Sequence, residues 1–339
     1  MIPLSALDLS FVTSGTPPRQ ALANSIDLAK HLDGLGFTRY WLAEHHSLPS
    51  VASSAPEILI GQIAAVTSNI RVGSGGVMLT NHAPLMVAER FKMLEGLFPG
   101  RIDLGLGRAP GTDQVTAYAL RRRLETRQGD DFLERLQELV AWESRDFPEG
   151  HPFRNVYAMP SDSPLPPIWL LGSSGYSADL AAMIGTGYAF AHHFSDYDGV
   201  GAMLSYRDKF QPSGWRDKPY AIAAVAAIVA DTDAEADGLA TSWDLNWLRR
   251  RRGETLPYPS PEEAAAFVYS DSERARVLQH RDRLFFGSPD SVVRQLRAFA
   301  QETKADELMI TTPVFDHQAR RRSYELLARE WGIMSAAQP

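Results

Sequence analysis

The sequence predicts one α/β domain that spans residues 1–339 and folds as a (β/α)8 TIM barrel. Apolar, β-prone runs alternate with helical patterns along the whole chain, and short connections join them, which is typical of a parallel sheet. The strand-like runs lie near 4–12, 37–43, 70–79, 101–107, 167–171, 187–191, 219–229 and 306–312. Eight alternations at this length favour a closed barrel over an open doubly wound sheet, which would have two edges and bury fewer helices.

Residues 73–113 show the repeating unit most clearly. A strand-like run over 70–80 precedes a helical pattern that opens at Pro84, and the pair Pro99-Gly100 ends that helix. A second strand follows over 101–107. This strand lacks the polar alternation of a half-exposed strand, so both of its faces must be covered, as in a barrel surrounded by helices.

The other helices are predicted from apolar residues at helical spacing. In the helix over 19–35, Leu22, Ile26, Ala29 and Leu32 form one stripe, and Gly36 ends the helix. Further helical patterns cover 54–66, 114–142, 177–184, 196–210, 233–251, 288–302 and 316–331. Residues 254–286 interrupt the rhythm with prolines and a charged run, so we expect an insertion after the seventh strand, either a mobile lid or a disordered linker.

Composition narrows the classes of function. The formal net charge of -7 gives no electrostatic basis for binding nucleic acid or an anionic membrane. The absence of cysteine excludes disulfides, thiolate catalysis and cysteine-based metal sites. No histidine motif typical of a metal site is present, so we predict no metal. No apolar run is long enough to span a membrane and no secretion signal opens the chain, so a cytoplasmic location is expected.

Polar residues follow several of the predicted strands, where barrel enzymes place their active sites. These positions are Glu44-His45-His46, Thr80-Asn81-His82, Arg108, Gly172-Ser173-Ser174-Gly175 and His192-His193. Adjacent histidines at a strand end point to opposite sides, so one of each pair is expected to face the cavity. A histidine there, with an ordinary pKa of about 6.5, suits proton transfer near neutral pH.

Arg108 and the turn over 172–177 are predicted to be two halves of one phosphate site. The turn joins a strand to a helix, so its backbone N–H groups point at an anion, and the serine hydroxyls add donors. Arginine adds a forked, permanently charged donor. The alternative for the same residues is a serine helix cap and a surface arginine. The spacing over 105–111 is not that of a dinucleotide-binding fingerprint, and no Walker A motif is present.

A set of motifs follows in order along the chain: Trp41-Leu-Ala-Glu44-His45-His46, Val72-Gly73-Ser-Gly75-Gly76-Val77, Thr80-Asn-His82-Ala-Pro84, Gly100-Arg101-Ile-Asp103-Leu-Gly105, Gly107-Arg108, the turn over 172–178, and the final strand over 306–312. In this order the motifs resemble those of the bacterial-luciferase-like flavin-dependent monooxygenases, and the resemblance covers residues 4 to 331. The turn is similar to that of a widespread luciferase-like subgroup more than to that of the light-emitting enzymes, which have an acidic residue in place of Gly172. Oxidation of a long-chain aldehyde with light emission is therefore not expected.

This resemblance implies an enzyme that takes reduced FMN from a separate flavin reductase and uses O2, through a C4a-(hydro)peroxyflavin, to oxygenate a small organic substrate. His45 matches the catalytic histidine of the family, and Arg108 matches the arginine that holds the FMN phosphate. The pair Gly75-Gly76 matches the residues under the flavin ring, often joined by a cis peptide bond. The remaining residues assigned to the cofactor are Gly172, Ser173, Ser174, Gly175, Tyr176 and His192.

Three further expectations follow from the resemblance. A transient reductase partner and a homodimer formed through helices of the first half are typical of relatives. A deazaflavin (F420)-dependent dehydrogenase on the same fold is an alternative activity, and a non-catalytic flavin-binding protein is another. The segment 254–286 falls where relatives have a mobile loop, so it is expected to act as a lid that keeps water from the reaction.

Overall fold

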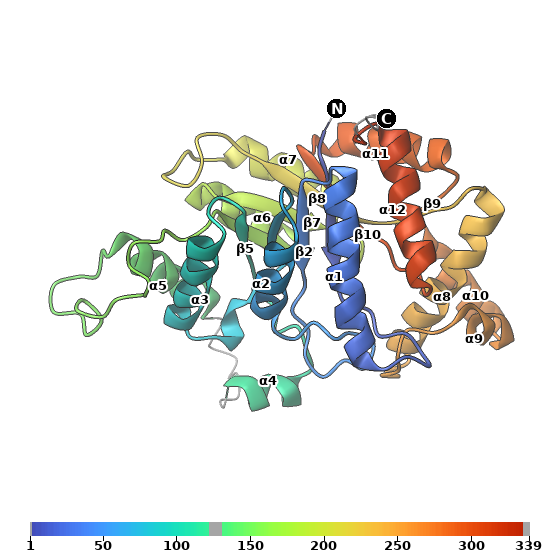
Figure 1. Ribbon diagram of the computed structural model, residues 1–339, viewed down its shortest axis with the longest axis horizontal. Helices are drawn as coiled ribbons and strands as arrows, with labels where there is room; N and C mark the ends of the chain where they lie inside the picture. Colours follow the sequence, from blue (N-terminus) through green and yellow to red (C-terminus); the bar gives the residue numbers. More distant parts are fainter. Residues whose placement is uncertain (1, 122–130, 335–339) are drawn as a thin grey trace.

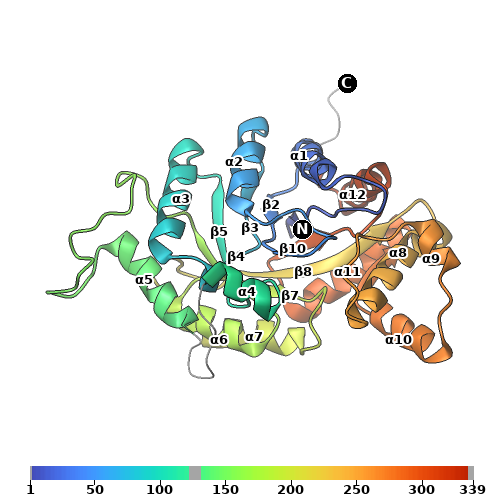
Figure 2. The same ribbon diagram turned by 90° about the horizontal axis from the view of Figure 1, so that it is seen from below.

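The computed structural model describes residues 2–121 and 131–334, which form a closed parallel barrel surrounded by helices (Figures 1 and 2). The barrel strands are β1 (Leu4–Asp8), β2 (Arg39–Leu42), β3 (Arg71–Ser74), β5 (Ile102–Gly107), β6 (Ile168–Gly172), β7 (Gly187–Ala191), β8 (Ala221–Val229) and β10 (Glu307–Thr311). They pair in this order, and β10 closes the ring between β8 and β1. The predicted TIM barrel is confirmed.

Two short strands extend the sheet beyond the barrel. The single strand predicted over 70–79 is in fact β3 and β4 (Val77–Met78), interrupted at Gly75-Gly76, where the peptide bond is cis. β4 pairs with β5. β9 (Leu284–Gly287) pairs with β8 at the end of the 254–286 insertion, and the sequence pattern did not predict this strand.

Helices alternate with the strands, and most of them cover the outside of the barrel, whereas α9 and α10 lie beyond α8 (Figure 2). They are α1 (Pro18–Leu35), α2 (Pro56–Val66), η1 (Leu79–Asn81), α3 (Pro84–Leu97), α4 (Gln114–Arg121), α5 (Phe132–Ser144), α6 (Gly175–Ile184), α7 (Gly199–Lys209), α8 (Asp233–Arg251), α9 (Pro261–Ala266), α10 (Asp271–Arg281), α11 (Pro289–Thr303) and α12 (His317–Trp331). The 114–142 pattern forms two helices, and part of its middle lies outside the described residues. No helix among the described residues has the length and apolar character needed to cross a membrane.

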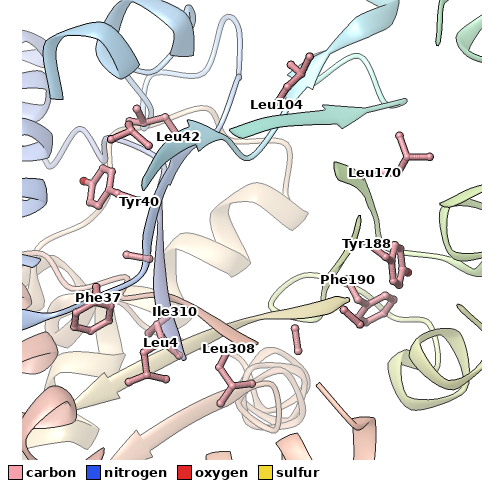
Figure 3. Close-up of a cluster of buried hydrophobic side chains, with 14 of the residues drawn as sticks. Leu4, Phe37, Tyr40, Leu42, Leu104, Leu170, Tyr188, Phe190, Leu308 and Ile310 are labelled. Atoms are coloured by element: carbon pink, nitrogen blue, oxygen red, sulfur yellow. The ribbon is translucent and has the colours of Figure 1, made fainter. Parts of the chain in front are cut away.

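The barrel strands bury side chains on both faces. Their outward side chains, including Tyr40, Leu104 and Tyr188, pack against the helices (Figure 3). The inward set includes Trp41 and Trp169, whose rings meet edge to face at 5.5 Å and fill the barrel interior. Because both faces of the strands are buried, most strand residues are apolar and the strands read in the sequence as nearly continuous apolar runs.

Buried charges occupy the end of the barrel where the strands begin. Arg39 and Arg71 donate to the carboxylate of Asp103, at 2.8 and 2.6 Å, and Arg39 also reaches Glu307 at 3.0 Å. Burial alone would raise the pKa of Asp103, but the two guanidinium groups lower it. Each buried charge has an opposite partner, which such burial requires. This end of the barrel is therefore structural.

The 254–286 insertion contains α9 and α10 and ends in β9. Ser270 and Glu273 form a capping box at the start of α10. Arg249 of α8 binds Glu263 of α9 at 2.8 Å, and Arg281 of α10 binds Asp244 of α8 at 2.6 Å. The insertion therefore packs against α8.

Candidate active site

His45 follows β2 on the side of the chain that faces the barrel interior, in the same alternation as Trp41 and Ala43. Its backbone N–H donates to the carbonyl of Ser53 at 2.9 Å, which fixes the loop. Its Nδ1 is buried and has no hydrogen-bond partner among the described residues. Burial, with the positive charge of Arg250 as the next contribution, lowers the pKa of His45 to about 4. The imidazole is therefore neutral near pH 7.

His193 lies across the barrel mouth from His45, after β7. Its Nδ1 is 3.2 Å from the carbonyl oxygen of Ala224, so Nδ1 carries the proton and Nε2 is left to accept a hydrogen bond. Burial lowers the pKa of His193 to about 4, and the nearby charge of His45 acts in the same direction. Both imidazoles are therefore neutral near pH 7, and the charge of one acts on the titration of the other.

His192, which was assigned to the cofactor from the sequence, lies elsewhere. Its ring packs against Phe299 of α11 at 4.5 Å and against Phe285 of β9 at 6.2 Å, on the outside of the barrel. Burial lowers the pKa of His192 as well. The structure thus brings His193, and not His192, toward His45. Strand alternation could have indicated this, because Tyr188 and Phe190 share their side of β7 with position 192.

Glu44 holds three segments of the rim together. Its buried carboxylate accepts hydrogen bonds from Nε2 of His46 at 2.8 Å, from Nε2 of His82 at 2.9 Å and from the backbone N–H of Met78 at 2.9 Å. Burial would raise the pKa of Glu44, but these donors lower it. Glu44 is therefore an ionised positioning residue that ties the loop of His45 to β4 and η1.

The loop after β5 reaches the loop of His45. The backbone N–H of His46 donates to Gly111 at 3.2 Å, and the hydroxyl of Thr112 donates to the His46 carbonyl at 2.9 Å. At the start of the same loop, the guanidinium carbon of Arg108 lies 4.3 Å from the centre of the Tyr176 ring. The two predicted halves of the phosphate site are therefore in contact.

The turn between β6 and α6 has the form expected of an anion site. Ser174 is the N-cap of α6, yet its side chain makes no capping hydrogen bond, so it leaves first-turn N–H groups without a side-chain acceptor. The Ser195 hydroxyl donates to the carbonyl of Ser173 at 2.7 Å and holds the turn against the β7 loop. A Cβ on Gly172 would lie 2.3 Å from Oγ of Ser177, so this position requires glycine.

Gly75 and Gly76 lie directly against the barrel interior. A Cβ on Gly75 would come within 2.7 Å of Leu7 and 3.0 Å of Trp41. A Cβ on Gly76 would come within 2.7 Å of the carbonyl oxygen of Gly105. Neighbouring protein atoms therefore already occupy the space that a side chain at either position would need, so both positions require glycine.

Four sequence-predicted features meet at one rim: His45, the Gly75-Gly76 pair, Arg108 and the turn over 172–176. Sequence reasoning did not single out Arg250 of α8, whose charge acts on His45. Arg250 stands in a run of four arginines, a pattern typical of an exposed helix face, and no local pattern shows which of them acts on the site. Among the described residues, no group of His, Asp or Glu is arranged to hold a metal ion.

Comparison with known proteins gives consistent matches over the whole chain. The luciferase-like monooxygenase family matches residues 4–307. A luciferase-like monooxygenase of Escherichia coli K12 is 44% identical over 96% of this chain and 96% of its own length. The N-acetyl-S-alkylcysteine monooxygenase of Bacillus subtilis is 33% identical over 97% of this chain and 98% of its own. The crystal structure of apo-MsnO8 superposes with a TM-score of 0.90 at 38% identity, covering 98% of this chain and 99% of that one.

Proposed function

The chain belongs to the luciferase-like monooxygenase family, and we propose that it is the oxygenating component of a two-component system that uses reduced FMN and O2. The observation that carries this proposal is the contact between Arg108 and Tyr176 on the same rim as a neutral His45. A monooxygenase of this family acts on a small organic substrate. We infer that a separate reductase supplies the reduced flavin, since the sequence has no nicotinamide-binding motif.

The residues present fit FMN. Arg108 and the first turn of α6 would hold the phosphate, because together they offer a guanidinium and uncapped N–H groups. The flat backbone of Gly75 and Gly76 would lie under the ring system. When bound, reduced FMN would supply the electrons that activate O2.

His45 is proposed to transfer a proton at its Nε2 atom during the reaction. With a pKa of about 4 in the free protein it is too weakly basic to hold a proton near pH 7. Negative charge brought in by ligands would raise its pKa toward the working range, because an opposite charge favours the protonated form. Proton transfer by His45 would thus depend on an occupied site.

Turnover with labelled oxygen tests the proposed function. The protein is loaded with FMN, reduced, and mixed with 18O2-saturated buffer and a thioether such as N-acetyl-S-methylcysteine, chosen because one relative is named for N-acetyl-S-alkylcysteines. We expect delayed return of oxidised-flavin absorbance and one labelled oxygen atom in a product. Immediate flavin reoxidation without labelled product, over a panel of thioethers, ketones and aldehydes, would contradict the proposal. Hydride transfer to F420 under anaerobic conditions would instead identify a deazaflavin-dependent dehydrogenase.

Variants separate binding from turnover. His45→Gln is expected to retain FMN affinity and to lose most oxygenation, because it removes the proton-transfer group and keeps the site polar. His192→Gln is the matched control, since His192 packs on the outside of the barrel. Equal turnover of His45→Gln and the parent protein would exclude the assigned role.

We also propose a homodimer through the outer faces of α2 and α3. Large apolar side chains are exposed there: Ile58, Val66, Met86, Met93 and Leu97. Such a concentration on adjacent helices is typical of a protein–protein interface. Sedimentation analysis of the parent protein and of Met93→Lys tests this, with a dimer expected for the first and a shift toward monomer for the second. A monomeric parent protein would contradict it.

The 254–286 insertion is proposed to act as a lid over the site. It is attached to α8 by the ion pairs of Glu263 and Asp244 and stands beside the barrel mouth (Figure 2). Limited proteolysis within this segment should slow when FMN and substrate are bound. Unchanged cleavage would argue for a fixed insertion.

A further inference from the structure

Four consecutive arginines, residues 249–252, end α8 and its cap, and three of them have carboxylate partners. Arg249 binds Glu263 at 2.8 Å, Arg252 binds Glu273, and Arg251 approaches Asp196 at 3.8 Å. Arg250 has no ion pair or hydrogen bond from its side chain to any of the described residues. Carboxylates therefore lie near the neighbouring arginines, whereas Arg250 has no counter-ion in the described part of the chain.

The chain that leaves α8 runs directly over the loops of the barrel mouth. The backbone N–H of Tyr258 donates to Val12 at 2.8 Å, and that of Val12 donates to Ser50 at 2.9 Å. Ser53, a few residues further along the same loop, accepts from the backbone N–H of His45 at 2.9 Å. These hydrogen bonds attach the segment that follows α8 to the loop that also holds His45, so α8 ends within a few residues of this rim.

Arg250 differs from an ordinary surface arginine in its own pKa and in its effect on His45. Its side chain is accessible to solvent, yet burial by the surrounding protein lowers the pKa of its guanidinium. Its positive charge is close enough to His45 to lower the pKa of that imidazole. Arg250 is therefore a solvent-accessible cation whose charge reaches His45, so a ligand bound beside His45 would lie within range of that charge.

We propose that Arg250 binds an acidic group of the substrate, most simply a carboxylate, and so places the substrate beside His45. This inference rests on the proposed function, and it adds a substrate class to it. A guanidinium presents a planar, forked set of donors that matches a carboxylate, so the contact would give direction as well as affinity.

The proposed site for the cofactor phosphate is separate from Arg250. That group is assigned to Arg108 and the turn before α6, which follow β5 and β6, whereas Arg250 belongs to the helix after β8. β7 lies between β6 and β8 in the barrel. Arg108 and Arg250 thus offer positive charge at two separate places on one rim. One suits a ligand with a phosphate, and the other suits a second ligand with its own acidic group.

Substrate binding at Arg250 would also act on His45. The charge of Arg250 lowers the pKa of His45, and a bound carboxylate would offset that charge and raise the pKa again. Proton transfer by His45 would then be favoured only when an acidic substrate is in place. The free enzyme would keep His45 neutral near pH 7.

Binding measurements with matched acid and amide probes test the proposal. Calorimetry on the FMN-loaded protein compares benzoate with benzamide, and N-acetyl-S-methylcysteine with its carboxamide. We expect the parent protein to prefer at least one acid over its amide by roughly 10- to 100-fold, the range of a charge-assisted hydrogen bond. Arg250→Gln should abolish this preference and leave amide binding unchanged, and Arg250→Lys should restore part of it. Arg251→Gln, which removes a solvent-exposed charge on the adjacent residue, is the control and should keep the preference.

The outcomes separate this inference from the proposed function. No preference for any acid in the parent protein, or a preference that survives in Arg250→Gln, overturns the inference. A loss of affinity for FMN but not riboflavin in Arg250→Gln also overturns it, because the guanidinium would then serve the cofactor phosphate. An Arg250-dependent acid preference without any oxygenation would support the anion site and contradict the monooxygenase proposal.

Discussion

The guanidinium carbon of Arg108 lies 4.3 Å from the centre of the Tyr176 ring, which joins the loop after β5 to the first turn of α6. The ring face attracts the cation and holds it beside uncapped N–H groups. The two parts of the proposed anion site are therefore already in contact in the protein without a ligand. Preorganisation of this kind reduces the entropy lost on binding.

Arg108→Ala is expected to weaken FMN binding by roughly 10- to 100-fold, since it removes a charge-assisted contact to the phosphate. Riboflavin, which has no phosphate, should bind the variant and the parent protein equally. Fluorescence titration of both flavins measures the two affinities. Arg19→Ala, on the exposed start of α1, is the control and should change neither. Equal loss for riboflavin would show that Arg108 supports the fold of the loop and not the phosphate.

The barrel could be predicted from the sequence because its strands are mostly apolar runs buried on both faces, and helices alternate with them along the chain. Strand ends were less predictable, since the break between β3 and β4 depends on Gly75 and Gly76 meeting Trp41 and Gly105 across the sheet. Such contacts join residues far apart in the chain, and no local pattern encodes them.

The site was only partly predictable, because it too depends on contacts between residues far apart in the chain. Strand-end positions indicated His45 and Arg108, and the two neighbouring turns meet as expected. The choice between His192 and His193 depends on the alternation of side chains along β7, in which Tyr188, Phe190 and position 192 share the outer face. The role of Arg250 could not be predicted from the sequence. Arg249 and Arg251 have carboxylate partners in the folded protein and Arg250 does not, and only the tertiary structure shows this difference.

Two glycine substitutions should have opposite effects on stability. A Cβ on Gly105 would lie 2.1 Å from the carbonyl oxygen of Ser74, which is backbone and cannot move aside easily. Gly105→Ala is therefore expected to lower the free energy of unfolding by about 3 kcal/mol or more. Gly238 lies in α8 with nothing near its Cβ position, so Gly238→Ala should raise it by roughly 0.5–1 kcal/mol. Urea unfolding measures both, and a neutral Gly105→Ala would refute the packing at Ser74.

Stability should fall as the solution is acidified through the window between pH 6.5 and pH 4. Burial lowers the pKa of His193 to about 4, so the unfolded chain binds a proton in this window that the folded protein does not. Folding stability therefore rises with pH across the window and is fully present above it. A shift of this size corresponds to about 3 kcal/mol for one buried imidazole.

His193→Asn isolates this contribution. Asparagine can keep the hydrogen bond to Ala224 through its amide nitrogen and does not titrate. The slope of the unfolding free energy against pH is proportional to the number of protons taken up on unfolding. Between pH 4 and pH 6.5 this slope should therefore decrease by the equivalent of up to one proton. Unfolding curves at several pH values give the slope, and an unchanged slope would mean that His193 titrates normally in the folded protein.

Glu44→Gln should destabilise the rim of the site. The two carboxylate oxygens of Glu44 accept from His46, His82 and Met78, and all three partners are donors in this arrangement. An amide group places an N–H₂ toward at least one of those donors, and a tautomer change at one histidine can relieve only part of the conflict. A buried group left unsatisfied in this way costs roughly 1–3 kcal/mol. Thermal unfolding should show the loss, and FMN affinity should fall with it because the loop of Arg108 contacts His46 through Gly111.

Glu57→Gln provides the matched control for Glu44→Gln. Glu57 binds Arg90 at 2.6 Å in a pair that solvent partly reaches, so its neutralisation should change the unfolding free energy by less than about 1 kcal/mol. The carboxylate of Glu44 has a lowered pKa, so its contribution is present at neutral pH and is lost as pH falls through that pKa. The difference between the two variants should therefore be largest near pH 7 and shrink in strong acid. Equal unfolding temperatures for both variants at pH 7 would mean that the buried carboxylate does not hold the loops of His45 and Arg108 together.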